Sequence, residues 1–120
     1  MSLDVSLVRK KWTSYDAGKT LTEETEEVYE ANITHNLGDM AEEAGIYKAL
    51  WRPEEIDCVI ASDIVPLLEE GLKKLLSKPA YYTTFDSPNG WGLYVHFVPF
   101  VEKYLEACQE YPEAIIEVSR

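Results

Sequence analysis

The sequence predicts an α+β domain in which a small antiparallel sheet packs against three to four helices. Apolar residues alternate with polar ones near the start, which indicates a strand. Apolar residues recur at spacings of three and four through the middle of the chain, which indicates helices. A short apolar run near the end indicates a last strand. We therefore expect one domain over residues 1–120 with the order β-β-α-α-α-β.

The sheet is expected to combine an N-terminal hairpin with a C-terminal strand. Leu3, Val5 and Leu7 alternate with polar neighbours, which predicts a half-buried first strand. Residues 16–19 have turn composition, and a second strand is expected over residues 26–31. The last strand, at about residues 114–118, is expected to pair with the first, because an apolar strand at a terminus needs a partner.

The first helix is expected to begin near residue 34 and to end at Gly45, which tolerates a left-handed conformation. Its apolar face would carry Ile33, Leu37, Met40, Ala41 and Ala44. Residues 46–51 are interpreted as an apolar connector that stops before Pro53, and residues 54–61 as a short helical turn.

Two longer helices are expected in the second half of the chain. The clearest apolar periodicity covers residues 62–77 and ends before Pro79. Residues 86–90 have loop composition. An aromatic-rich helix follows over residues 92–111, and Pro99 inside it should kink the helix or restart it.

The charge of the chain excludes several classes of partner. There are 22 acidic and 11 basic residues, for a net charge of −11, and the excess is concentrated in residues 22–57. Direct binding of nucleic acid needs a basic surface, and docking on anionic lipid needs the same, so neither is expected. The apolar runs are too short for a membrane span, and residues 1–10 lack an export signal, which predicts a cytoplasmic protein.

No motif indicates a metal, a cofactor or a known catalytic reaction. Cys58 and Cys108 are far apart and lie in apolar patterns, which predicts two buried thiols. There is no Cys-x-x-Cys and no paired His spacing, so no metal site is expected. Phosphate-binding loops and nucleophile elbows are also missing, so no cofactor is expected and the catalytic residues, if any, are unknown.

The densest polar group in the sequence is Asn32, Thr34, His35 and Asn36. At a helix start, amides and an imidazole lie beside free backbone N–H groups, a combination that suits an anionic or hydrogen-bonding ligand. The alternative is that Asn32 and Thr34 simply cap the helix while His35 lies on the surface.

Aromatic residues form a second candidate group. It contains Trp51 with Arg52, a common combination at interfaces, and Asn89 with Trp91, where flanking glycines permit close approach of the backbone. The alternative is that both tryptophans cover the edge of the core. His96 is expected at the flank of the last helix, either packed there or, if it meets His35, as part of an acid–base pair.

Several segments resemble a family of short, functionally uncharacterised proteins encoded in bacterial genomes and in phages or prophages. The resemblance rests on residues 31–37 (ANITHNL), 40–47 (MAEEAGIY), 50–54 (LWRPE), 89–92 (NGWG), 100–108 (FVEKYLEAC) and 118–120 (VSR). It implies no activity, cofactor or catalytic residue. A phage-linked setting would imply an accessory role.

These observations predict a binding or interaction module without catalysis of its own, for a small ligand or protein partner. One alternative is an acidic decoy that occupies the basic groove of a host nucleic-acid-binding protein, through residues 23–30 and 42–55. Another is a small enzyme that uses His35 with Asn36 and His96. The exposed edge of a small sheet and the many aromatic residues are also consistent with a homodimer.

Overall fold

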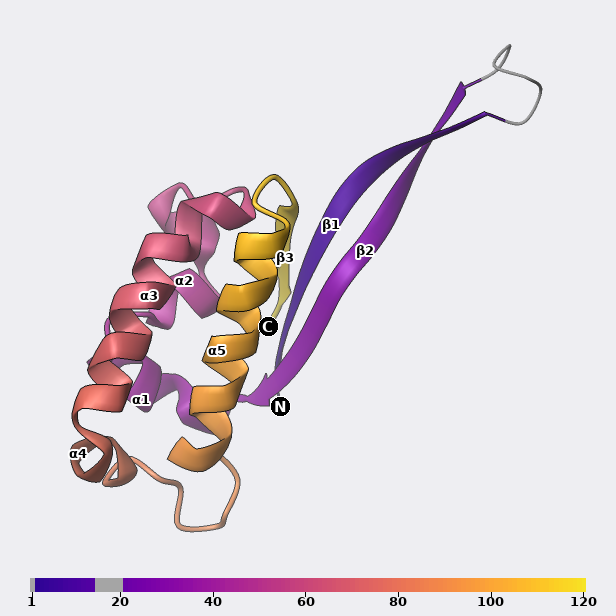
Figure 1. The fold of residues 1–120 in the computed structure, drawn as a ribbon. Coiled ribbons are helices and arrows are strands. Elements are labelled where there is room, and N and C mark those ends of the chain that lie inside the picture. Colours follow the sequence, from indigo (N-terminus) through magenta and orange to yellow (C-terminus); the bar gives the residue numbers. More distant parts are fainter. Residues whose placement is uncertain (1, 15–20) are drawn as a thin grey trace.

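The computed structural model describes residues 2–14 and 21–120 and confirms the α+β class and the order β-β-α-α-α-β. Strands β1 (Ser2–Ser14), β2 (Leu21–Thr34) and β3 (Ile115–Ser119) form an antiparallel sheet in the order β2-β1-β3. The N-terminal hairpin is therefore present, and the last strand pairs with the first, as expected. The helices lie on one side of this sheet (Figure 1). The expected turn at residues 16–19 falls outside the described residues.

The segment between β2 and β3 is divided into more helices than the sequence predicts. They are η1 (His35–Leu37), α1 (Gly38–Glu43), α2 (Tyr47–Trp51), η2 (Pro53–Ile56), α3 (Ala61–Ser77), α4 (Pro79–Thr83) and α5 (Tyr94–Glu110), where η marks a 3-10 helix. The prediction of a connector over residues 46–51 was wrong. Ala49, Leu50 and Trp51 are all buried there and Lys48 is exposed, but five residues are too few to show a helical period.

Helix α4 was also not expected, because Pro79 was interpreted only as the end of α3. Pro79 instead occupies the first position of α4, where its missing N–H would have no helical partner anyway. Helix α5 does not restart at Pro99 but runs through it as one element. The carbonyl of Val95 loses its helical donor, and Val95 is 63% exposed, so water can take the donor's place.

The core lies between the inner face of the sheet and the helices. Leu3, Val5 and Leu7 are fully buried, which agrees with their alternation in the sequence. Tyr29 of β2 stacks on Tyr104 of α5 with ring centroids 5.9 Å apart. The Tyr104 hydroxyl is buried and has no hydrogen-bond partner among the described residues. Burial raises the pKa of Tyr104.

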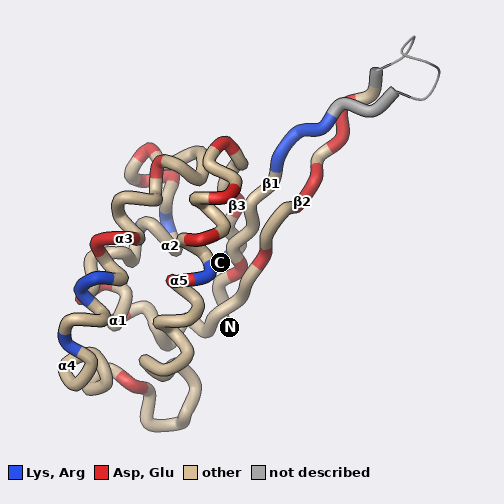
Figure 2. Tube along the Cα trace, viewed as in Figure 1, with Lys and Arg blue, Asp and Glu red and all other residues tan. Residues whose placement is uncertain are grey.

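Part of the hairpin extends beyond the helices, and we call residues 9–14 with residues 21–26 the arm (Figure 1). The pairing of β1 with β3 stops at Val8, so the arm is a two-stranded ribbon. Basic residues of β1 face acidic residues of β2 (Figure 2). Arg9 pairs with Glu26 at 2.9 Å and Lys10 with Glu23 at 3.0 Å. The arm contributes to the elongated extents of 59 × 27 × 23 Å.

Candidate ligand-binding cleft

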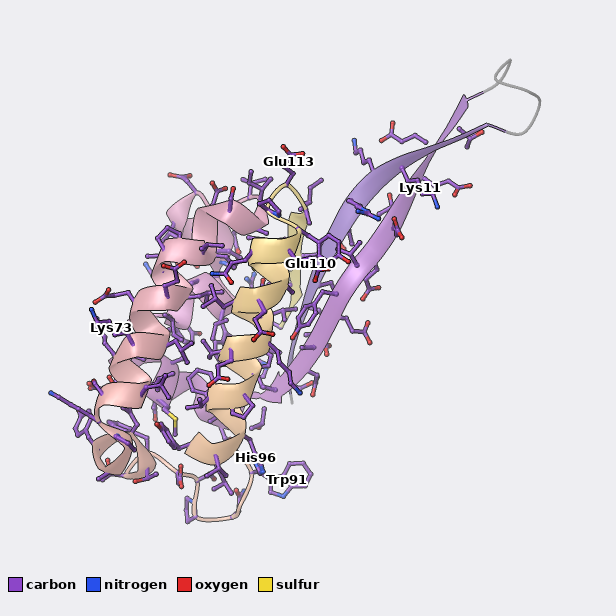
Figure 3. The ribbon with its side chains drawn as sticks, viewed as in Figure 1. Lys11, Lys73, Trp91, His96, Glu110 and Glu113 are labelled. Atoms are coloured by element: carbon purple, nitrogen blue, oxygen red, sulfur yellow. The ribbon has the colours of Figure 1, made fainter. Side chains whose placement is uncertain are left out.

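A cleft of about 1070 Å³ lies where β2 ends, beside the loop that precedes α5. It is lined by Ser2, Asn32, Ile33, Thr34, His35, Asn36, Leu37, Asn89, Gly90, Trp91, Gly92 and His96. Every candidate residue from the sequence except Trp51 and Arg52 is on this surface. Figure 3 shows the side chains of Trp91 and His96 at the end of the molecule where α5 begins. The fold thus brings three separate segments to one concave surface.

The loop wall approaches the other wall closely because position 92 has no side chain. Gly92 is buried and has a φ of +108°, a conformation that L-residues rarely adopt. A Cβ atom there would lie 2.9 Å from the Cβ of Asn36 and 3.4 Å from Cγ2 of Thr34. The distance to Asn36 is shorter than Cβ atoms adopt in proteins, so a glycine is required for the two walls to meet this closely.

Hydrogen bonds fix the loop and join it to the opposite wall. The Asn36 side chain donates from Nδ2 to the carbonyl of Trp91 at 2.8 Å. Asn89 accepts at Oδ1 from the Trp91 backbone N–H at 2.9 Å and from the Ser87 hydroxyl at 2.6 Å. Because both its N–H and its carbonyl are bonded, the backbone of Trp91 is held, although the residue is 70% exposed.

His35 lies at the base of the cleft, immediately after β2. Thr34 caps the short helix η1, its Oγ1 accepting from the N–H of Asn36 at 3.3 Å. The imidazole is half-buried and meets the ring of Trp51 edge-on, with centroids 6.2 Å apart. Its Nε2 is buried and lacks a hydrogen-bond partner within the described part of the chain. Among the described residues, this nitrogen and the Tyr104 hydroxyl are the two buried side-chain polar atoms without a partner.

Trp51 and Arg52 do not line the cleft. Trp51 is only 2% exposed and stacks on Tyr47 at 5.2 Å, so it supports His35 from beneath. The guanidinium of Arg52 instead pairs with Glu55 at 3.2 Å. The structure therefore separates the two tryptophans that the sequence grouped as similar: one belongs to the core and the other to the surface.

His96 is exposed in the first turn of α5 and completes the far side of the cleft. Asp86 anchors this turn, since its Oδ1 accepts from the N–H of Tyr94 at 2.7 Å. A smaller hollow of about 370 Å³ lies next to the cleft and shares His35 and Asn36 with it. The hydrogen bonds found between described residues do not include one between the two imidazoles.

The cleft amides share one arrangement, in which one end is bonded within the fold and the other is open. Asn32 donates from Nδ2 to Asp4 at 2.6 Å, and Asn36 donates to Trp91, so both oxygens remain available. Asn89 is bonded through its oxygen, so its Nδ2 remains available. No partner for these three free ends occurs in residues 2–14 and 21–120.

The lining residues that sequence reasoning did not select are mostly small or apolar. Ser2 is one of them, and it lies across from Thr34 in the hairpin register. The predicted hairpin could have indicated this position, because in an antiparallel hairpin the start of the first strand lies beside the end of the second. Gly92 also gave a signal through the glycines that flank Trp91, although its contact with Asn36 could not be read from the sequence.

In the part of the chain that the structure describes, no cluster of His, Cys, Asp or Glu is arranged to hold a metal ion. Cys58 and Cys108 are free and buried, in agreement with their apolar neighbours. None of the helices described is both long enough and apolar enough to cross a membrane. The chain matches no protein-family model, no curated protein and no solved structure.

Proposed function

We propose that this chain is a binding module without catalysis of its own and that the cleft beside Trp91 is its ligand site. The observation that carries the proposal is the convergence of an exposed indole with three half-bonded amides and an unsatisfied imidazole nitrogen. A concave surface that combines exposed aromatic area with a few fixed polar groups is typical of ligand sites. The resemblance noted above adds an accessory role in a phage-linked setting as part of the same proposal.

A fragment screen by two-dimensional NMR on the uniformly ¹⁵N-labelled chain tests this proposal. We expect hits that shift the side-chain amide signals of Asn32, Asn36 and Asn89 and the indole N–H signal of Trp91. The same hits should be lost or weakened in Trp91→Ala and unchanged in Val95→Ala, an exposed position that does not line the cleft. Hits that shift only residues remote from the cleft, or no hits at all, would contradict the proposal.

The acidic decoy remains a second candidate because of the outer face of the sheet. Glu30 of β2 and Glu117 of β3 both pair with Ser6, so they lie in one row across the sheet. A hydrogen bond with the Glu27 carboxyl, together with the charges of Glu27 and Asp4, raises the pKa of Glu30. Such crowding of like charges supports a surface for a basic partner.

The structure changes which acidic residues would serve a decoy. Glu23 and Glu26 are paired within the arm, and Glu54 is paired with Arg120. Capture of a basic protein at low salt should therefore depend on Glu27 and Glu30. A pull-down in which Glu27→Gln/Glu30→Gln retains every basic partner of the wild type would remove this candidate.

The third candidate, a small enzyme with a His/Asn site, is supported by one observation, that His35 and His96 line the same cleft. It requires both imidazoles to act on one bound ligand. Turnover of any ligand found in the screen, abolished by His35→Gln and by His96→Gln, would favour it over simple binding. Binding without turnover would favour the module.

A further inference from the structure

We propose that the ligand of the Trp91 cleft is an uncharged, planar heteroaromatic ring with hydrogen-bonding groups at its rim, as in a nucleobase or a free nucleoside. This inference rests on the proposed function, because it names the class of ligand for the same site. It follows from three properties of the cleft: its charge, its exposed ring and the polarity of its free amide ends.

The cleft lacks formal charge in a chain that is rich in it. Charged residues make up 28% of the sequence, yet Asp, Glu, Lys and Arg are all absent from the described residues that line the cleft. An anionic ligand would find no cation in the lining, and it would approach a protein of net charge −11. Asp39 and Asp86, in the adjacent hollow, add to this repulsion. Phosphate-bearing ligands are therefore disfavoured relative to their neutral counterparts.

Trp91 provides a flat apolar surface on a backbone that is held in place. Its backbone is bonded on both sides, by Asn89 and by Asn36, while the residue is 70% exposed. Stacking on an aromatic side chain favours a planar ligand, and a loop whose backbone is ordered before binding loses little entropy on binding. The exposed ring therefore favours a planar ligand. A role in stacking on a ligand would also account for a tryptophan that is not packed against the protein.

The free amide atoms of Asn32, Asn36 and Asn89 define which hydrogen-bonding groups the edge of the ligand's ring must carry. The oxygens of Asn32 and Asn36 can accept hydrogen bonds, and Nδ2 of Asn89 can donate one. Their orientation is fixed, because the other end of each amide is bonded within the fold. A complementary ligand needs N–H donors together with an acceptor on one flat frame, and nucleobase edges combine these groups.

The test is a set of calorimetric and NMR titrations of the full chain with named probes. Adenosine, guanosine, cytidine and uridine represent the proposed class. Each nucleoside 5′-monophosphate adds only an anionic group, and glucose and N-acetylglucosamine represent neutral ligands that are not aromatic. We expect at least one nucleoside to bind at the cleft, more tightly than its monophosphate and than either sugar.

Variants connect this binding to the proposed contacts. Trp91→Ala should weaken nucleoside binding by about 5- to 140-fold, the range that loss of aromatic stacking implies. Asn89→Asp keeps the acceptor oxygen that holds the loop, but it replaces the free donor with an acceptor and adds a negative charge. It should therefore weaken binding by at least about 2- to 13-fold, the range for a lost hydrogen bond. Val95→Ala, exposed but outside the lining, should bind as the wild type does.

Each result separates this inference from the proposed function. If the cleft binds sugars or anions but no nucleoside, the ligand class is wrong and the binding module stands. If nucleosides bind equally well to wild type and Trp91→Ala, the stacking platform is wrong. If neither these probes nor the fragment screen shifts any cleft signal, both proposals fail.

Discussion

Two tyrosines on α5 have hydroxyl groups in opposite situations. The hydroxyl of Tyr94 donates to the carbonyl of Leu75 at 2.8 Å, whereas that of Tyr104 is buried without a partner in the described residues. Tyr104→Phe removes an unsatisfied group and should raise the free energy of unfolding, by up to about 1 kcal/mol. Tyr94→Phe removes a bonded group and should lower the free energy by about 1 kcal/mol. Urea denaturation of the two variants checks the difference in sign, and a loss of stability in both would contradict it.

The glycines beside Trp91 allow a matched comparison. At Gly92 an added Cβ meets Asn36 at 2.9 Å, whereas at Gly90, with a φ of +80°, nothing lies within 4 Å. Gly90→Ala should lower the free energy of unfolding by about 1–2 kcal/mol through backbone strain alone. Gly92→Ala should cost about 1–3 kcal/mol more, because it also separates the walls of the cleft. Thermal unfolding measures both, and equal losses would show that the contact with Asn36 is unimportant.

Single residues show where sequence reasoning succeeds and where it stops. The residues from Asn32 to Asn36 line the same cleft, as neighbours in the chain readily do. Their meeting with Trp91 and His96 depends on the loop after α4, and no pattern in the sequence fixes that path. Trp51 was a candidate for the ligand surface beside Arg52, with packing against the core as the alternative, and the structure supports the alternative.

Helices and strands could be predicted from the sequence where one face is buried and the other is exposed to solvent. The alternation in β1 and the periodicity of α3 each report such a contrast, and both predictions were confirmed in type. The short helices α2 and α4 were missed, because five residues are too few to show a period. The strands are longer than expected because the arm is stabilised by cross-strand charge pairs, which leave no apolar signal.

Helix α3 contains a glycine that intrinsic helix propensity alone would not place there. A Cβ at Gly71 would lie 2.2 Å from Cγ2 of Ile46, a side chain that is itself 1% exposed. Helix propensity favours Gly71→Ala by about 1 kcal/mol, but overpacking of a filled core costs about 1–3 kcal/mol. We expect a net loss of stability in chemical denaturation. The loss should be smaller when Gly71→Ala is added to an Ile46→Ala background, which lacks Cγ2. Glu70→Ala, exposed on the same helix, should be nearly neutral.

Charge is distributed over the whole molecule so that the arm is balanced and the outer face of the sheet is not. Glu30 has a raised pKa, so its carboxyl group stabilises the fold most when it is protonated. That contribution is present at acid pH and is lost as the pH rises through the raised pKa. Above it, the ionised group opposes the fold.

Glu30→Gln should therefore raise the melting temperature at pH 7 and low salt. The gain should shrink as salt screens Glu27 and Asp4, and it should vanish below about pH 4, where glutamates protonate. Glu113→Gln, exposed at the far end of α5, serves as the control for a general change in net charge. A gain of equal size in both variants would assign the effect to the net charge of the protein and not to the outer face.

Strand β2 connects the arm to the cleft, with one register shift in its pairing with β1, between Leu7 and Val8. It runs from Leu21 to Thr34, about 45 Å at the usual rise per residue, and His35 follows directly. One backbone therefore spans both ends of the molecule. A pulling force applied at Glu23, for example in an optical trap, would act along the backbone of β2. It would therefore act on the backbone of His35, whose imidazole packs against Trp51.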